Sequence, residues 1–274
     1  MVWTQITRAQ YRRDHLVYAS DTTDAEWLLL SFFLPARCRV GRPREVALRA
    51  VMNAILYILA TGCQWRALPK NFPPRSTVQY YFYIWRDQRL WRRINLALVR
   101  RARQAMGRDS VPSAGVIDSQ SAKTTESGGL RGFDAAKRIR GRKRHMVTDT
   151  QGLLLALLVH TANIQDNHGA VPLLASLRQT FPKLRHIFAD RVYRGEQLRN
   201  AIATFGRWTI DIVTRSEKVG TFKPEPKRWV IERTFAWFGR NRRLAKDFER
   251  TIVSAEAWFL IASVRMLSRR LARA

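Results

Sequence analysis

The sequence is poor in cysteine, in paired histidines and in long apolar runs. Cys38 and Cys63 are the only cysteines and lack CxxC spacing, which argues against a disulfide framework or a structural zinc site. None of the five histidines forms an HxxxH or HExxH pair, so a histidine-based metal centre is not indicated. No apolar run reaches the roughly 18 residues that a membrane-spanning helix needs, and the N-terminus lacks the apolar core of a signal peptide. We therefore expect a cytoplasmic protein without a membrane partner.

Positive charge, in contrast, is abundant. Lys and Arg number 49 against 21 Asp and Glu, which gives a formal net charge of +28. Such self-repulsion is tolerated more easily if the working partner is a polyanion, so nucleic acid is the first candidate. The alternative is a merely solubilising surface, but charges of both signs usually alternate on such a surface. A hydrophobic content of 46% is ample for a folded core in one large or two modest domains.

The first part of the chain has a helical pattern. Residues 1–19 are polar and basic without a clear period, and we expect a mobile arm there. Apolar residues at three- and four-residue steps over 20–106 predict a short helix near 26–30 and three longer helices at 43–61, from Ser76, and at about 90–106. Arginines on or beside the last two helices, including Arg75 and Arg86, are typical of a helix-turn-helix that lies across DNA. Small helical bundles with other functions have the same pattern.

A linker at 107–114 separates this helical part from residues 115–274, where the sequence pattern predicts both strands and helices. Strands are predicted from 115 to Asp118, at 145–149 and 153–160 with a hairpin turn between them, at 184–189 and at 208–213. Helices are predicted from Asp166, at 196–203, at 228–243 and at 254–273. This order of three strands, helix, strand, helix, strand, helix is ribonuclease H-like. The predicted class is therefore α/β, with a ribonuclease H-like mixed sheet core preceded by a small all-α helix-turn-helix-like domain.

Three carboxylates have comparable positions in this order. Asp118 ends an apolar run on the first strand, Asp190 closes the fourth strand, and Glu232 lies in a late helix. The first and fourth strands of such a sheet are neighbours, so the two aspartates can meet. Carboxylate oxygens favour hard cations, and two Mg²⁺ or Mn²⁺ ions would suit in-line phosphoryl displacement, with Asp118 bridging them. The alternative is that Asp190 is only a strand-end cap and Glu232 only a surface residue.

Basic residues surround these carboxylates in the sequence. At 100° per residue, Arg228, Glu232 and Arg243 share one helical stripe with two small residues, which suits close approach of a phosphate backbone. The same helix could instead be amphipathic core with its aromatic residues buried. The run 131–144 contains seven basic residues; it is either a solvated charge run or a DNA-holding segment at the catalytic edge. The expected DNA contacts are Lys123, Arg138, Arg140, Arg142, Lys143, Arg144, Arg194, Arg228, Arg240 and Arg243, together with Arg75 and Arg86.

Four separated motifs resemble one protein family. The segments 117–124 (Ile-Asp-Ser-Gln-Ser-Ala-Lys-Thr), 141–145 (Gly-Arg-Lys-Arg-His), 189–195 with Tyr193-Arg194-Gly195, and 228–237 are similar to those of bacterial insertion-sequence DDE transposases, in the group named after insertion sequence five. The segment 61–69 is similar to the helical domain before the catalytic core of that group. One departure is Arg191-Val192, where family members often carry small residues. Another is that only 41 residues separate Asp190 from Glu232, too few for the large inserted domain of some relatives.

The resemblance implies a specific activity. It suggests a metal-dependent enzyme, using two Mg²⁺ or Mn²⁺ ions, that binds double-stranded DNA at terminal inverted repeats, cleaves there and joins the 3′-hydroxyl ends to target DNA. Asp118, Asp190 and Glu232 match the family triad. We further expect a homo-oligomer, a dimer or larger, in a synaptic complex associated with the nucleoid of the bacterial cytosol. Two other readings are a DNA-binding regulator or chromatin protein without chemistry, and a ribonuclease H-like nuclease or resolvase that cleaves without joining.

Overall fold

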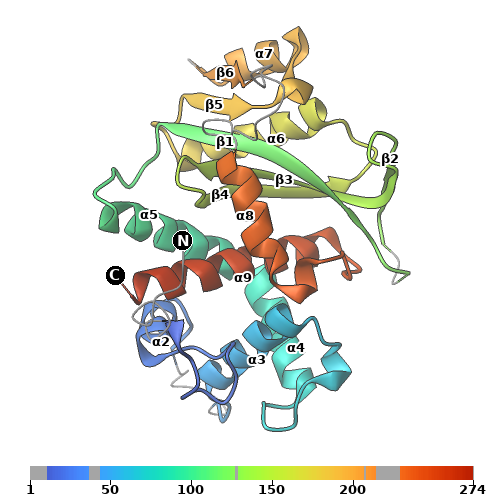
Figure 1. Cartoon of the computed structure of the whole chain (residues 1–274). Helices are drawn as coiled ribbons and strands as arrows, with labels where there is room; N and C mark the ends of the chain where they lie inside the picture. The colour runs from blue at the N-terminus through green and yellow to red at the C-terminus, as the bar shows by residue number, and fades with distance from the viewer. Residues whose placement is uncertain (1–10, 37–43, 127–128, 207, 214–228, 274) are drawn as a thin grey trace, which may run out of the picture.

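A computed structural model describes residues 11–36, 44–126, 129–206, 208–213 and 229–273. A mixed sheet lies above a group of helices (Figure 1). The elements in chain order are α2 (Asp24–Ser31), α3 (Leu48–Thr61), η1 (Trp65–Ala67), α4 (Arg75–Asp87), α5 (Leu90–Ala105), β1 (Ala114–Lys123), β2 (Gly132–Asp134), β3 (Ile139–Asp149), β4 (Leu154–Thr161), α6 (Asp166–Thr180), β5 (His186–Ala189), η2 (Arg191–Tyr193), α7 (Glu196–Ala203), β6 (Thr209–Ile212), α8 (Trp229–Gly239), η3 (Arg242–Leu244) and α9 (Ile252–Leu271).

The sheet has the strand order β2-β3-β1-β5-β6, and β4 also pairs with β3. β1, β3 and β4 are antiparallel neighbours, whereas β5 and β6 run parallel to β1. Parallel neighbours need long crossovers, and α6 and α7 lie in these connections. The predicted mixed ribonuclease H-like sheet, with the first strand beside the fourth predicted one, is confirmed.

Alternation along β1 gives the two faces of the sheet different partners. Ser119 faces α6, since its hydroxyl donates to Asp166 in the first turn of that helix. Gln120 and Ala122 face the opposite side, where they share a cavity lining with Phe235 of α8. Because side chains alternate in a strand, Asp118 lies on the α8 side of the sheet.

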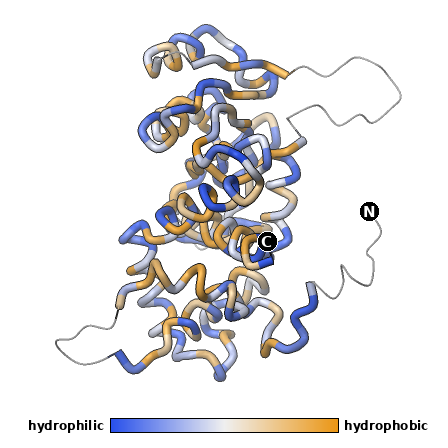
Figure 2. The backbone as a smooth tube through the Cα atoms, turned by 90° about the vertical axis from the view of Figure 1, so that its left-hand side faces the viewer, coloured by the Kyte–Doolittle hydropathy of each residue, from blue (hydrophilic) through white to orange (hydrophobic). Residues whose placement is uncertain are grey.

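The helical part and the sheet share one continuous buried core. Figure 2 shows apolar segments running through the middle of the molecule. The C-terminal helix α9 packs among the N-terminal helices: the rings of Phe82 and Trp258 stack at a centroid distance of 4.7 Å. Asn95 of α5 joins both parts, because it accepts a hydrogen bond from Ser263 (2.6 Å) and donates to the carbonyl oxygen of Leu154 in β4 (2.9 Å). In space, α9 therefore belongs with the helices of residues 20–106.

The expected mobile arm is corrected for residues 11–19. Arg13 donates to both carboxylate oxygens of Glu26 (2.6 and 2.9 Å), and Tyr18 stacks on Phe72 with ring centroids 5.0 Å apart. These contacts hold the segment against the helices. Residues 1–10 lie outside the described part of the chain.

Several element boundaries also differ from the predicted ones. β3 begins at Ile139 rather than near 145, so the expected basic excursion is part of a central strand. α4 begins at Arg75, one residue before the predicted start at Ser76. α8 ends at Gly239, short of the predicted 243. Cys63 is a free, half-buried thiol, and Cys38 lies outside the described residues. Among the helices that the structure describes, none is long and apolar enough to cross a membrane.

Candidate active site

The pairing of β1 with β5 aligns the two aspartates. The paired residues Gly115 with Ile187 and Val116 with Phe188 each differ by 72 in residue number. Asp118 and Asp190 have the same offset, and each lies two residues beyond the last of these pairs. Asp118 lies within β1 and Asp190 directly follows β5, so the register of these two strands, whose backbones are about 4.8 Å apart, brings both aspartates to the same level of the sheet.

The electrostatics around Tyr193 support this alignment. Tyr193 belongs to η2, directly after Asp190, and only 2% of it is exposed. Burial raises the pKa of its phenol well above the usual value, and the charges of Asp118, Asp166 and Asp190 raise the pKa further. One buried hydroxyl thus lies within the field of three carboxylates. The backbone N–H groups of Ser119 and Val192 donate to Asp118 (2.7 Å) and Asp190 (3.0 Å), respectively.

Glu232 lies on the exposed edge of α8. The predicted stripe is confirmed for Glu232, Ala236 and Gly239, which are all exposed. Gly239 has open space where a Cβ would stand, so a ligand backbone can approach this stripe closely. Phe235 and Phe238 face the sheet, where they line a cavity of about 340 Å³ with Gln120, Ala122 and Lys123 at the end of β1. α8 therefore packs on the face of the sheet that carries Asp118.

The three carboxylates are not gathered into a closed metal site. Within the described residues, no group of three or more Asp, Glu, His or Cys side chains is close enough to hold a metal ion. The register of β1 and β5 relates Asp118 to Asp190, and Glu232 lies on α8, which packs against the sheet beside β1. Their donor chemistry still fits a hard divalent cation, because all three supply carboxylate oxygens.

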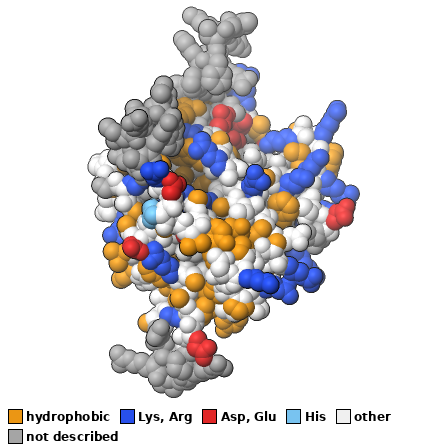
Figure 3. Space-filling model, turned by 60° about the horizontal axis from the view of Figure 1, so that its bottom comes forward, with side chains coloured by type: hydrophobic (Ala, Val, Ile, Leu, Met, Phe, Trp, Pro, Cys, Tyr) orange, Lys and Arg blue, Asp and Glu red, His pale blue; other side chains and the backbone are white. Residues whose placement is uncertain are grey.

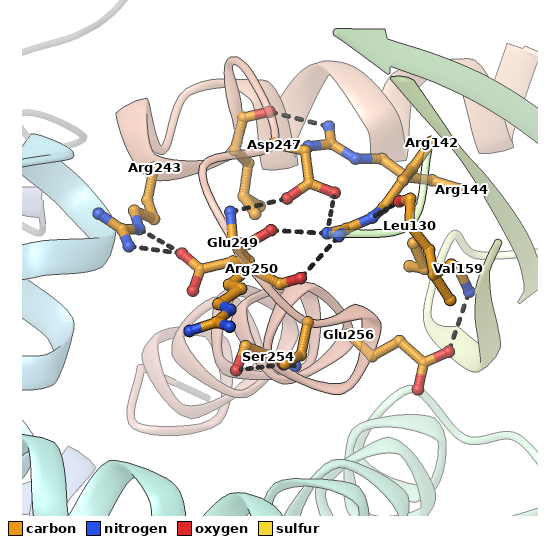
Figure 4. A network of polar contacts seen from close by, with 12 residues as sticks. Leu130, Arg142, Arg144, Val159, Arg243, Asp247, Glu249, Arg250, Ser254 and Glu256 are labelled. Atoms are coloured by element: carbon orange, nitrogen blue, oxygen red, sulfur yellow. Dashed lines mark hydrogen bonds and ion pairs between the residues drawn. The ribbon is translucent and has the colours of Figure 1, made fainter. Parts of the chain in front are cut away.

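Four of the expected DNA contacts are buried inside the protein instead. Arg142 and Arg144 are 0% and 3% exposed, and Lys143 and Arg243 are 5% and 8% exposed. Figure 4 shows Arg142 donating to Asp247 (3.1 Å) and to carbonyl oxygens of the loop before α9. The expectation of a DNA contact is corrected for these four residues, because their side chains already bind acceptors in the interior.

Each of the other three buried cations has its own internal partners. Arg144 donates to the carbonyl oxygen of Leu244 and stacks over Phe259, and burial lowers its pKa to about 10. Lys143 donates to Asp166 (3.0 Å), and Arg243 binds Glu249 through both Nε and Nη2. The buried cations of this basic run therefore form contacts inside the protein that connect the sheet to η3 and α9.

Most of the remaining predicted contacts are exposed. Lys123, Arg138, Arg140, Arg194, Arg240 and Arg75 face solvent and remain predicted DNA contacts. Arg86 is largely covered, since it donates to Ser254 and Asp87 and lies over the ring of Tyr83. Arg228 lies outside the described residues. Figure 3 shows clusters of Lys and Arg beside apolar side chains on the face of the helical part.

One polar cluster beside the aspartates was missed by the sequence analysis. Asp166, predicted only as the start of a helix, accepts hydrogen bonds from Ser119 and Lys143, and His145 lies 3.4 Å away from it. His145 and His160 are themselves joined at 2.7 Å. The spacing of these residues carries no motif; the antiparallel hairpin of β3 and β4 brings the two histidines together.

Comparisons with known proteins agree with this arrangement. The family described as transposase DDE domain matches residues 109–267, which is more than half of the chain. The chain belongs to the DDE transposases. A second family, described as putative transposase of the IS4/5 family, matches residues 22–95 of this transposase, so the resemblance noted in its motifs is confirmed.

A putative transposase for insertion sequence element IS402 from Burkholderia cepacia is 33% identical over 120 residues. That alignment takes in 40% of this transposase and 54% of the relative, so the chain spans about half the length of the curated relative it matches.

Proposed function

We propose that this DDE transposase chain is a metal-dependent enzyme that cleaves double-stranded DNA at the terminal inverted repeats of an insertion sequence and joins the 3′-hydroxyl ends to target DNA. The observation that carries the proposal is the parallel register of β1 and β5, which supports the approach of Asp118, on β1, to Asp190, the residue directly after β5. Glu232, on a helix packed against the same face, is the third carboxylate. Family membership supports the assignment of the reaction class.

The carboxylates would hold two Mg²⁺ or Mn²⁺ ions, with Asp118 shared between them. When bound, such ions supply positive charge that stabilises the in-line displacement at phosphorus. Asp190 and Glu232 would each complete the ligands of one ion, and Glu232 joins the aspartates once DNA lies along the exposed stripe of α8. The exposed cations, among them Lys123 and Arg140, would hold the phosphate backbone.

The partners follow from this chemistry. Double-stranded DNA is bound both as the element ends and as the target, and two ends are held together by a homo-oligomer, a dimer or larger. The bacterial nucleoid is the place of action. These assignments rest on the resemblance, on the excess of positive charge and on the open basic surface beside β1 and α8.

The test is strand cleavage of duplexes that carry the DNA bordering the coding region. Asp118→Asn should abolish Mg²⁺-dependent cleavage while DNA affinity stays within about twofold of wild type, because only the metal ligand is lost. Asp211→Asn is the matched control, since Asp211 is an exposed aspartate on β6. Equal cleavage by wild type and Asp118→Asn would remove the carboxylates from the mechanism.

A supercoiled target plasmid separates the competing functions. A transposase gives covalently joined end–target products, whereas a nuclease or resolvase gives cleaved ends and no joined product. A regulator or chromatin protein binds the duplex and shows no cleavage that depends on a divalent ion.

A further inference from the structure

The residue that follows Asp118 in β1 connects this strand to α6 on the opposite face of the sheet. Ser119 points to the opposite face of the sheet, where its hydroxyl donates to Asp166 at 2.8 Å. The backbone N–H of the same Ser119 donates to Asp118 at 2.7 Å. A shift of Ser119 therefore moves the backbone next to Asp118, and with it the N–H group that donates to the Asp118 carboxylate.

Asp166 is itself held by cationic and polar neighbours. Its side chain is 12% exposed, and Lys143, with a side chain 6% exposed, donates to it at 3.0 Å. Although burial acts to raise it, the pKa of Asp166 is held well below the usual value by the nearby His145 ring and by hydrogen bonds from Lys143 and Ser119. The Ser119 hydroxyl thus donates its hydrogen bond to an ionised, nearly buried carboxylate.

A pair of histidines closes the cluster. The carbonyl oxygen of Thr161 can only accept, so His160 Nδ1 is the donor in their 2.8 Å contact. His160 Nε2 then accepts from His145 Nδ1 at 2.7 Å, which leaves His145 Nε2 facing Asp166 at 3.4 Å. This nitrogen is buried and has no hydrogen bond of standard geometry to a described residue. The cluster therefore has one open position for a proton, directed at Asp166.

The close packing of α6 against the two histidines depends on a glycine. Gly169 of α6 lies against the pair: a Cβ there would stand 2.5 Å from His145 Cε1 and 2.6 Å from His160 Nε2. Any other residue would separate α6, and with it Asp166, from β3. The ring of Tyr193 lies 6.2 Å from that of His145, and the Tyr193 hydroxyl lies near Ser119 without a hydrogen bond of standard geometry in the described structure.

From this geometry we infer that Asp166 is a positioning residue for the proposed reaction. Through Ser119 it fixes the orientation of the Asp118 carboxylate, and Lys143 with the His145–His160 pair fixes Asp166 in turn. The inference rests on the proposed function, because it assigns a support to one of the proposed metal ligands. Outer hydrogen bonds of this kind orient a ligating carboxylate, and their loss typically weakens metal binding by about 10- to 100-fold.

The chain supplies its own control at the next position on the same face. Ser121 of β1 is buried and donates to the buried Asp134 at 2.5 Å, and Lys143 lies 3.6 Å from that carboxylate. Asp134 thus resembles Asp166 in accepting a hydrogen bond from a β1 serine and in lying near Lys143, but its serine is two residues farther along β1 from Asp118. A purely structural role predicts equal effects of the two aspartates on the site, whereas a positioning role predicts an effect of Asp166 alone.

The experiment measures Mn²⁺ binding to the full chain from the electron paramagnetic resonance signal of free Mn²⁺. Asp166→Asn should raise the Kd for Mn²⁺ about tenfold, whereas Asp134→Asn should stay within twofold of wild type. In single-turnover cleavage at saturating DNA, Asp166→Asn should slow the rate without changing the Kd for DNA. Urea unfolding of both variants checks that they lose comparable stability.

Ser119 gives a second route if Asp166→Asn fails to fold. Ser119→Ala should weaken Mn²⁺ binding as Asp166→Asn does, and Ser119→Thr, which keeps the hydroxyl, should restore it. The double variant should be no worse than either single one, because both remove the same contact. Equal Mn²⁺ affinities of Asp166→Asn and Asp134→Asn, or of Ser119→Ala and wild type, would overturn the positioning role.

Asp118→Asn distinguishes this failure from failure of the proposed function. If Asp118→Asn loses Mn²⁺ binding while Asp166→Asn does not, the positioning role alone is overturned. If Asp118→Asn binds Mn²⁺ as wild type does, the proposed metal site is overturned, and the positioning role with it.

Discussion

At the scale of single residues, burial decides what each charged side chain can do. Arg140 and Arg142 lie on the same strand, yet Arg140 is exposed and Arg142 is 0% exposed. A desolvated guanidinium needs acceptors inside the protein, and Arg142 finds four of them, from Leu130, Asp247, Glu249 and Arg250. An arginine on this strand therefore binds acceptors inside the protein at position 142 and is accessible to a phosphate at position 140.

The buried histidines predict a pH dependence of stability. Burial lowers the pKa of both His145 and His160 in the folded chain. The unfolded chain, with ordinary pKa values near 6.5, therefore binds more protons as the pH falls through that value. Stability should be greatest above pH 6.5 and decline below it, with a slope of at most about 1.4 kcal/mol per pH unit for each histidine.

Urea unfolding between pH 5 and 8 checks this prediction. Within this window the acidic neighbour Asp166 stays ionised, because its pKa lies well below the usual value. His145→Gln should reduce the slope, and the exposed His15→Gln should leave it unchanged. A stability that is level across the window, or that rises in acid, would contradict the burial of two neutral imidazoles.

At the scale of elements, β3 connects the sheet to the C-terminal part of the chain. Arg142 and Arg144 point to the α9 side, where they bind Asp247 and the carbonyl oxygen of Leu244. Lys143 and His145 point to α6 on the other side. One strand therefore ties both covering layers to the sheet, which explains why the charges of Arg142, Lys143 and Arg144 are not on the surface.

Two substitutions on this strand should have opposite effects. Arg142→Met should lower the free energy of unfolding by about 3–5 kcal/mol, because it leaves the buried Asp247 without its cation. It should leave the salt dependence of DNA binding unchanged. Arg140→Met should leave stability within about 0.5 kcal/mol and reduce the slope of log K against log salt by about 0.9.

Urea unfolding and DNA binding at several salt concentrations measure both effects. If Arg142→Met reduced the salt slope as Arg140→Met does, the buried network would open on DNA and Arg142 would be a phosphate contact after all.

Sequence patterns predicted most of these elements but not all their ends. α7 lies at 196–203 as predicted, and Gly62 caps α3 in the left-handed conformation, with φ of 69°. These features depend on local apolar spacing and on the freedom of glycine at positive φ. The start of β3 could not be predicted in this way, because Arg142 and Lys143 are acceptable in a buried strand only when distant acceptors meet them.

At the scale of the whole molecule, the C-terminal helix completes the N-terminal helical part. Trp258 of α9 is 1% exposed and packs against Phe82 of α4 and Trp65. Arg103 of α5 and Asp149 of the β3–β4 hairpin form a buried ion pair between the helices and the sheet. The helices α3 to α5 and the C-terminal helix α9 thus share one buried core.

This arrangement predicts that a fragment of residues 1–106 does not fold alone. Without α9, the surfaces around Phe82 and Asn95 would be open to water, so the fragment should show no cooperative thermal unfolding by circular dichroism. A peptide of residues 252–273, added in excess, should restore helical signal and cooperativity. A cooperative transition of the fragment by itself would show that the helical part is an independent domain.

The order of strands and helices, the place of Asp118 on the first strand and the place of Asp190 directly after the fourth predicted strand were determined by the sequence itself. Apolar runs and their periods are local properties, and a carboxylate that follows a buried strand is visible in them. The tertiary structure alone decided that Arg142, Lys143 and Arg144 are internal, that α9 lies among the first helices, and that Asp166 meets Ser119. Each of these depends on contacts between residues far apart in the chain, whose energies no local pattern contains.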